Sequence, residues 1–170
     1  MERTGIITFQ GNPLTLIGNE VKVGDKAPEC EVLANDLSSY QLSSCSGKVC
    51  IISCVPSLDT PVCDTQTRRF NEEVADFGNA IVLLTISMDL PFAQARWCGT
   101  AGIDRALTLS DHSKADFGDK FGVLIKELRL LSRAIFIVDK DGVIRYVEIV
   151  SELTNEPDYD AAIKAVRDLL

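Results

Sequence analysis

The 170-residue sequence has a single histidine, a single tryptophan and no long hydrophobic run. Its longest uninterrupted candidate, IVLLTIS at residues 81–87, is the length of a strand and far shorter than the roughly 20 apolar residues that span a bilayer. The opening residues, MERTGIITFQGNP, lack the apolar core of a secretory signal. We therefore expect a cytoplasmic protein with no membrane association.

Positive charge is also scarce. The 17 lysines and arginines are outnumbered by 25 acidic residues, and the formal net charge is -8. Beyond short pairs such as Arg68-Arg69 there is no basic patch, which argues against nucleic acid as a partner. Catalysis by a histidine pair would have to use His112, whose setting in LSDHSK favours a surface or capping role.

What the sequence does contain is an ordinary globular composition and six cysteines. Hydrophobic residues make up 46% and charged residues 25% of a chain long enough to bury its own core, so we predict one domain over residues 1–170. In a cytoplasmic protein thiols stay reduced, and the cysteines of interest are catalytic, redox-active or metal-binding. The six cysteines are at positions 30, 45, 50, 54, 63 and 98.

Apolar runs and turn residues predict the strands. GIITF and LTLIG, separated by a Gly-Asn-Pro turn, predict a β-hairpin within residues 1–20, and the turn Asp-Lys-Asp-Gly at 139–142 predicts a second hairpin. KVCIISCV is nearly continuous in its hydrophobicity, as in a strand buried on both faces. The remaining strands are expected at 30–34, 81–87, 106–111, 134–138 and 143–149.

Capping residues predict the helices. Thr60 is a suitable N-cap, Pro61 fits the first helical position, and the apolar stripe of Phe70, Val74 and Phe77 leads to a stop at Gly78. Further helices are expected from Pro91 to Cys98 with a stop at Gly99, at 114–121, and after Pro157. This alternation of strands and helices predicts a three-layer α/β domain with a mixed central sheet.

Cys63 is the strongest candidate for a reactive group. With Thr60 as N-cap it is the third helical residue, where unpaired backbone N–H groups and the helix dipole favour a thiolate. The Thr60 hydroxyl is expected to reach the Cys63 backbone or its sulfur. Asp59 and Asp64 oppose a thiolate, so a cation is needed, and Arg133 is the candidate from a neighbouring strand. Taken alone, a cysteine at a helix start is more often a small structural core residue than a catalytic one, so the case for Cys63 depends on its neighbours.

Three other cysteines are spaced C-x4-C-x3-C. On a strand, Cys50 and Cys54 are about 13 Å apart, too far to share a metal ion, so we interpret Cys45, Cys50 and Cys54 as structural. Cys30 and Cys45 fall in loop-like stretches where we expect exposure and adventitious oxidation.

The segment PSLDTPVCDTQTRRFN, residues 56–71, strongly resembles the active-site stretch of the thiol peroxidases, the atypical two-cysteine branch of the peroxiredoxins. ITFQGNPLTL, VGDKAP, VLANDL, DLPFAQARWCG, LSDH, FGVLIKELRLLSRAIFIVDKDG and TNEPDY also resemble that family and occur in its order. The resemblance implies a thioredoxin-like fold with an added N-terminal hairpin.

The resemblance also implies roles for five residues. Cys63 would be the peroxidatic cysteine and Cys98, in RWCG, the resolving one. Thr60 would bind the sulfur and the peroxide, Arg133 would stabilise the thiolate, and Pro56 would shield the oxidised sulfur from water. Pro61 departs from the family, which commonly has glycine there, and we expect it to stiffen the start of the helix.

The implied reaction is the reduction of hydrogen peroxide and alkyl hydroperoxides. Cys63 would become a sulfenic acid and then form an intramolecular disulfide with Cys98, which thioredoxin would reduce. The family needs no cofactor or metal and is typically homodimeric. Because Cys63 and Cys98 lie on separate predicted helices, we expect both segments to unwind locally during turnover.

Three alternatives stay open. A dithiol–disulfide oxidoreductase on the same fold normally has C-x-x-C at the helix start, and here Asp64, Thr65 and Gln66 follow Cys63 with no second cysteine. A non-enzymatic redox sensor would use the same Cys63–Cys98 switch and differs only in lacking turnover. A metal-binding protein is the third, and metal analysis would test it.

Overall fold

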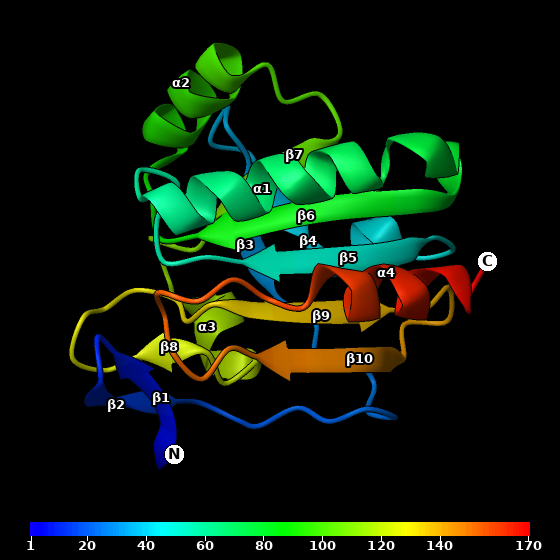
Figure 1. Ribbon diagram of the computed structural model, residues 1–170. Helices are drawn as coiled ribbons and strands as arrows, with labels where there is room; N and C mark the ends of the chain where they lie inside the picture. Colours follow the sequence, from blue (N-terminus) through cyan, green and yellow to red (C-terminus); the bar gives the residue numbers. More distant parts are fainter.

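The computed structural model describes all 170 residues and has a mixed central sheet of seven strands (Figure 1). Their order is β10-β9-β5-β6-β7-β3-β4, with β5, β6 and β7 parallel and the other neighbours antiparallel. The inner strand β5, third in this order, is buried along its whole length, as its continuous hydrophobicity predicts. The strands are β3 (Glu31–Leu33), β4 (Ser39–Gln41), β5 (Val49–Cys54), β6 (Ile81–Ser87), β7 (Ala106–Ser110), β9 (Ala134–Val138) and β10 (Ile144–Ile149).

Helices cover both faces of this sheet. Phe70 of α1 and Ile163 of α4 pack with Val49 and Ile51 of β5 on one face. Because strand side chains alternate, Ile52 points to the other face, together with Phe117 of α3 and its neighbours. The predicted three-layer α/β architecture is confirmed. The helices are α1 (Pro61–Glu73), α2 (Pro91–Ala101), α3 (Asp116–Lys120) and α4 (Tyr159–Arg167).

The predicted N-terminal hairpin is also present. β1 (Glu2–Phe9) pairs with β2 (Asn12–Ile17), which pairs with the short strand β8 (Leu124–Ile125) in a second, three-stranded sheet (Figure 1). Ile7, Leu16, Ile125 and Leu153 form its small core. The Leu153 amide donates to the carbonyl of Thr8, so the hairpin holds residues 151–153 in place.

Several helix ends differ from the sequence-based prediction. Helix α1 stops at Glu73, not at Gly78, and a 3₁₀ segment, Ala75–Ala80, bends at Gly78. Helix α2 continues through Gly99 to Ala101, because Gly102 takes the left-handed conformation that ends a helix and its amide donates to Cys98 O. Helix α3 is shorter than expected, since Ala115 before it has a positive φ of 52°.

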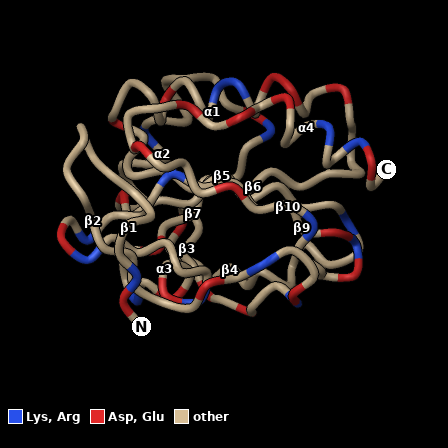
Figure 2. The backbone as a smooth tube through the Cα atoms, turned by 60° about the horizontal axis from the view of Figure 1, so that its bottom comes forward, with Lys and Arg blue, Asp and Glu red and all other residues tan.

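Charged side chains are mixed over the surface. Figure 2 shows lysines and arginines interspersed with acidic residues along the chain. Four ion pairs join residues one helical turn apart. Helix α1 illustrates this with Arg68–Asp64 and Arg69–Glu73.

None of the helices combines the length and the hydrophobicity that crossing a membrane requires.

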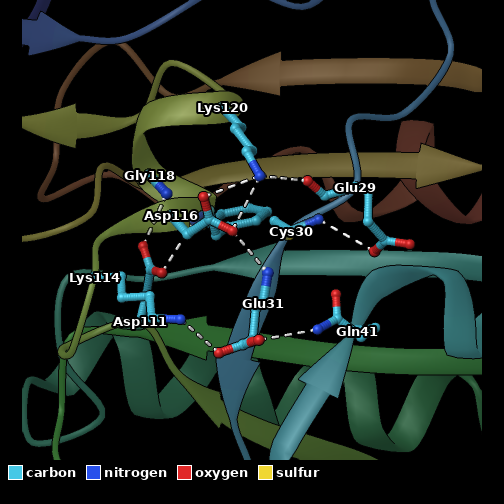
Figure 3. A network of polar contacts seen from close by, with 10 residues as sticks. Glu29, Cys30, Glu31, Gln41, Asp111, Lys114, Asp116, Gly118 and Lys120 are labelled. Carbon is cyan, nitrogen blue, oxygen red and sulfur yellow. Dashed lines mark hydrogen bonds and ion pairs between the residues drawn. The ribbon is translucent and has the colours of Figure 1, made fainter.

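A polar network fastens strand β3 to helix α3 (Figure 3). The Asp116 carboxylate accepts from the Glu31 amide at 2.8 Å, and Lys120 Nζ donates to Glu29 O at 2.8 Å. Beneath it the buried Asp111 carboxylate accepts from the amides of Phe117 and Gly118. Burial nevertheless raises the pKa of Asp111 to about 6.

This raised pKa predicts a pH-dependent cost of folding. In the unfolded chain an aspartate ionises near pH 4, so between pH 4 and 6 the folded state binds the extra proton and stability falls as the pH rises. In Asp111→Asn this dependence is absent. We expect the free energy of unfolding of wild type minus that of the variant to fall by up to about 3 kcal/mol on crossing that range.

Urea unfolding of both proteins near pH 4 and above pH 6 measures this difference. Asp160→Asn is the matched control, because the Asp160 side chain is 99% exposed. The difference in unfolding free energy between wild type and this control should be the same at both pH values. A wild-type-to-Asp111→Asn difference that is constant with pH would contradict the assignment.

Candidate active site

Cys63 lies in the first turn of α1, just beyond the carboxyl end of β5. Thr60 has the extended backbone of an N-cap and Pro61 is the first helical residue, so Cys63 is the third, as the sequence predicts. Its side chain is fully buried against Val55 and Leu58. A thiol here is enclosed by apolar groups on one side and by the unpaired amides of a helix start on the other.

Arg133 reaches the same place from the adjacent strand. The antiparallel pairing of β5 with β9 puts Ala134 opposite Cys54, so the preceding Arg133 lies beside the chain leaving β5. Its Nη1 is 3.4 Å from Cys63 Sγ, and the side chain is only 2% exposed. Nε and Nη2 both donate to Leu153 O, at 3.0 and 2.7 Å, which fixes the guanidinium plane.

Gln66 completes this arrangement, and the sequence analysis missed it. Its Oε1 accepts from Arg133 Nη1 at 2.9 Å, while its Nε2 donates to Ser53 Oγ at 2.8 Å. A polar residue three positions after Cys63, on the buried face of α1, was the available signal. No carboxylate pairs with Arg133, so its buried charge is directed at the sulfur instead of being neutralised.

Thr60 does not make the expected side-chain contact. Its hydroxyl donates to Ser57 O at 3.0 Å and bonds neither to the Cys63 amide nor to the sulfur. The backbone role is the predicted one, since Thr60 O accepts the first helical bond from the Asp64 amide at 3.0 Å. The hydroxyl turns back because the preceding residues form a tight turn, with the Thr60 amide bonded to Ser57 O.

Asp89 holds the loop that leads into α1, and it too was missed. Its carboxylate accepts from Ser57 Oγ at 2.7 Å and from the Leu58 amide at 2.8 Å. Pro56, at the start of this loop, is buried. Asp89 lies between the end of β6 and the start of α2, the helix that carries Cys98. Its carboxylate therefore connects the loop before Cys63 with the start of α2.

Cys98 is partly exposed on α2, and its sulfur lies 3.3 Å from Thr108 Oγ1. Its neighbour Trp97 packs against the apolar cluster of Val55, Leu58 and Cys63. The Trp97 Nε1 donates to Asp64 Oδ1 at 2.9 Å. Arg68 Nε binds the same carboxylate at 2.9 Å, and its guanidinium stands 5.7 Å from the Trp97 ring centre. We call Asp64, Arg68 and Trp97 the helix clasp, because they join the two cysteine-bearing helices.

The remaining cysteines are all buried free thiols. Cys30 and Cys45 are 2% and 7% exposed, so the expectation that they are exposed is wrong: hydrophobic neighbours of the larger core cover both. Burial raises the pKa of Cys30 to about 12 and raises that of Cys54 as well. No group of three or more His, Cys, Asp or Glu side chains has the arrangement of a metal site.

Residues 22–163 match the model of the Redoxin family. The chain is 59% identical over 164 residues to a thiol peroxidase of Halalkalibacterium halodurans, with 96% of this chain and 98% of that one covered. It is 58% identical, with the same coverage, to a thiol peroxidase of Bacillus subtilis.

Solved structures agree with these matches. A peroxiredoxin-like protein from Aquifex aeolicus superposes with a TM-score of 0.92 at 44% identity, over 99% of this chain and 98% of that one. A thiol peroxidase from Chromobacterium violaceum, 24% identical, has the same fold with a TM-score of 0.86 over 95% of both chains. The predicted thioredoxin-like fold is thereby confirmed. With the family model and the relatives both covering nearly its whole length, this chain belongs to the thiol peroxidases of the Redoxin family.

Proposed function

We propose that this thiol peroxidase reduces hydrogen peroxide and alkyl hydroperoxides with Cys63 and closes an intramolecular disulfide to Cys98. The single observation that carries the proposal is the contact between Cys63 Sγ and the buried Arg133 guanidinium, 3.4 Å away. A buried cation without a carboxylate partner favours the thiolate form of the sulfur in front of it. The thiolate is the form that attacks a peroxide.

In the first step the Cys63 thiolate attacks the terminal oxygen of the hydroperoxide. The O–O bond breaks, a sulfenic acid forms, and the leaving oxygen takes up a proton to become an alcohol or water. Charge grows on that leaving oxygen, so donors already aimed at the site lower the barrier. We assign this role to Arg133 and the first amides of α1. We assign Thr60, whose hydroxyl now bonds to Ser57 O, to the peroxide after a change of rotamer.

In the second step the Cys98 thiolate attacks the Cys63 sulfenic acid and displaces its oxygen as water. The net change is two thiols and one hydroperoxide to one disulfide, one alcohol and one water. The two sulfurs contact different partners, Arg133 and Thr108, and the helix clasp joins their helices. Closing an S–S bond of about 2 Å therefore requires α2 and the first turn of α1 to move.

Pro56 and Pro61 shape the site around these steps. Buried Pro56 fits the assigned role of keeping water from the oxidised sulfur. Pro61 restricts φ in the first turn of α1, the same turn that must unwind for the disulfide to form. The proline is thus expected to slow the second step more than the first.

The finer partners are part of the same proposal. A dithiol reductant of the thioredoxin type would return the disulfide to thiols by exchange, and the cytoplasm maintains the reducing conditions this needs. We also propose a homodimer. Leu90 and Phe92, at the start of α2, are 52% and 66% exposed and supply apolar surface for a second copy. Sedimentation at several concentrations tests this assembly.

The two cysteine roles are tested together by adding one equivalent of cumene hydroperoxide to reduced protein and mapping disulfides by peptide mass spectrometry. We expect a Cys63–Cys98 bridge in wild type, an oxidised Cys63 in Cys98→Ser, and no reaction at this stoichiometry in Cys63→Ser. Peroxide consumption over many turnovers with a dithiol reductant distinguishes an enzyme from a redox sensor. A wild-type protein whose Cys63 stays reduced would overturn the proposal.

Replacement of Arg133 by lysine tests the contact with the sulfur. Lysine keeps the charge but lacks the planar fork that binds Leu153 O, Gln66 and the sulfur at once. We expect single-turnover oxidation of Cys63, followed by stopped flow, to slow by roughly 100-fold. Arg145→Lys, at an exposed ion pair with Asp139, should react like wild type. An Arg133→Lys rate equal to that of wild type would remove Arg133 from the mechanism.

The helix clasp predicts a separate effect on the second step. Trp97→Phe keeps the aromatic packing and loses the hydrogen bond to Asp64, worth about 1 kcal/mol. We expect disulfide formation to accelerate by roughly fivefold while sulfenic acid formation is unchanged. Rapid acid quench, alkylation and mass spectrometry resolve the two steps. A second step that is unchanged or slower would show that the clasp does not oppose the movement.

A further inference from the structure

Helix α2 meets strand β7 through two side chains on one face of the helix. Gln94 and Cys98 are four residues apart, so they lie one turn above the other on α2. Gln94 Nε2 donates to Leu109 O at 2.8 Å. One turn later, Cys98 Sγ lies 3.3 Å from Thr108 Oγ1. Two successive turns of α2 are therefore held by two neighbouring residues of β7.

The two contacts differ in strength. Gln94 is fully buried, and its Nε2 donates to Ser87 Oγ at 3.0 Å as well as to the main chain of β7. Cys98 is only partly buried, and a thiol is a weak donor and a weak acceptor of hydrogen bonds. The Gln94 turn is thus anchored in the core, whereas the Cys98 turn can leave β7 without it.

Thr108 is itself held by a residue from another strand connection. The Thr108 side chain is 1% exposed, and its Oγ1 donates to Asn35 Oδ1 at 3.1 Å. Strand register explains this contact, because Leu33 at the end of β3 pairs with Ser110 of β7 in antiparallel orientation. Two residues farther on, the same register places Asn35 opposite Thr108. We call Asn35, Thr108 and Cys98 the thiol latch.

The single hydrogen of the Thr108 hydroxyl fixes the direction of the contact with sulfur. A threonine hydroxyl has one hydrogen to donate and two positions that accept. Since the hydrogen goes to Asn35 Oδ1, Thr108 Oγ1 presents only lone pairs to Cys98. Cys98 is then the donor, and the contact binds its protonated thiol. A thiol attacks only as its thiolate, so Cys98 is unreactive while this contact is intact.

We propose that Thr108 and Asn35 are positioning residues for Cys98: the thiol latch holds the Cys98 thiol against β7, and its opening contributes to the barrier of disulfide formation. The proposal rests on the role of Cys98 in the second step. Opening of the latch releases the thiol to solvent, where it loses its proton and attacks the Cys63 sulfenic acid. The departing oxygen takes up a proton and leaves as water, so the overall reaction is unchanged.

The latch also affects a competing reaction of Cys63. While Cys98 is held against β7, the Cys63 sulfenic acid is available to a second hydroperoxide. That peroxide oxidises the sulfenic acid to a sulfinic acid and is itself reduced to an alcohol or water. A weaker latch shortens the lifetime of the sulfenic acid, so it should lower the yield of sulfinic acid at high peroxide concentration.

Thr108→Val tests the latch, because valine keeps the branched shape of threonine and removes the hydroxyl. We expect disulfide formation to accelerate by roughly threefold, the effect of losing one weak hydrogen bond, while sulfenic acid formation is unchanged. Rapid acid quench, alkylation and mass spectrometry resolve the two steps. Thr108→Ser restores the hydroxyl without the methyl group and should return the wild-type rate, which a role in packing alone would not do.

Thr100→Val is the matched control. It removes a hydroxyl from α2 that donates to Arg96 O on the same helix, and it should react like wild type in both steps. The latch is refuted if Thr108→Val forms the disulfide no faster than wild type, or if Thr108→Ser and Thr108→Val change the rate equally. A wild type that forms no Cys63–Cys98 disulfide at all would instead refute the proposed function.

Reduced protein without peroxide provides a measurement that does not depend on turnover. Alkylation of Cys98 by iodoacetamide at neutral pH should be roughly threefold faster in Thr108→Val than in wild type, because the released thiol loses its proton more readily. Asn35→Ala should also accelerate it, since the Thr108 hydroxyl is then free to donate to the Cys98 thiolate. Alkylation as slow in both variants as in wild type would contradict the latch whatever the peroxidase assay shows.

Discussion

The buried guanidinium of Arg133 is the interaction around which the site is built. A charge that is 2% exposed, with no carboxylate beside it, is costly unless other groups compensate. Leu153 O and Gln66 Oε1 accept hydrogen bonds from the guanidinium, and its Nη1 also faces Cys63 Sγ. The same desolvation that makes the charge costly makes it effective on an anionic sulfur.

The rest of the fold keeps that guanidinium in place. The antiparallel contact of β9 with β5 delivers Arg133, and the N-terminal hairpin holds Leu153 through the carbonyl of Thr8. The N-terminal hairpin therefore supports Leu153, near the C-terminus of the chain, and the Leu153 carbonyl in turn orients Arg133. Asp89 acts similarly on the opposite side, because it fixes both the loop before Cys63 and the start of α2.

Local signals in the sequence predicted much of this correctly. The continuous apolar run at 48–55 became β5, and Thr60 with Pro61 set the start of α1, because caps and strand burial depend on neighbouring residues. The ends of α1 and α2 were predicted less well. Gly78 and Gly99 looked like stops, yet which glycine adopts the left-handed conformation depends on the packing of the following strand.

The sequence alone determined the order of the elements, the position of Cys63 in its helix and, through extended motif resemblance, the family. Only the tertiary structure decided which groups surround the sulfur. Gln66 and Asp89 act through contacts with distant segments of the chain, and the burial of Cys30 and Cys45 overturned an expectation of exposure. Pairwise contacts between distant segments depend on strand register, which is settled when the sheet assembles.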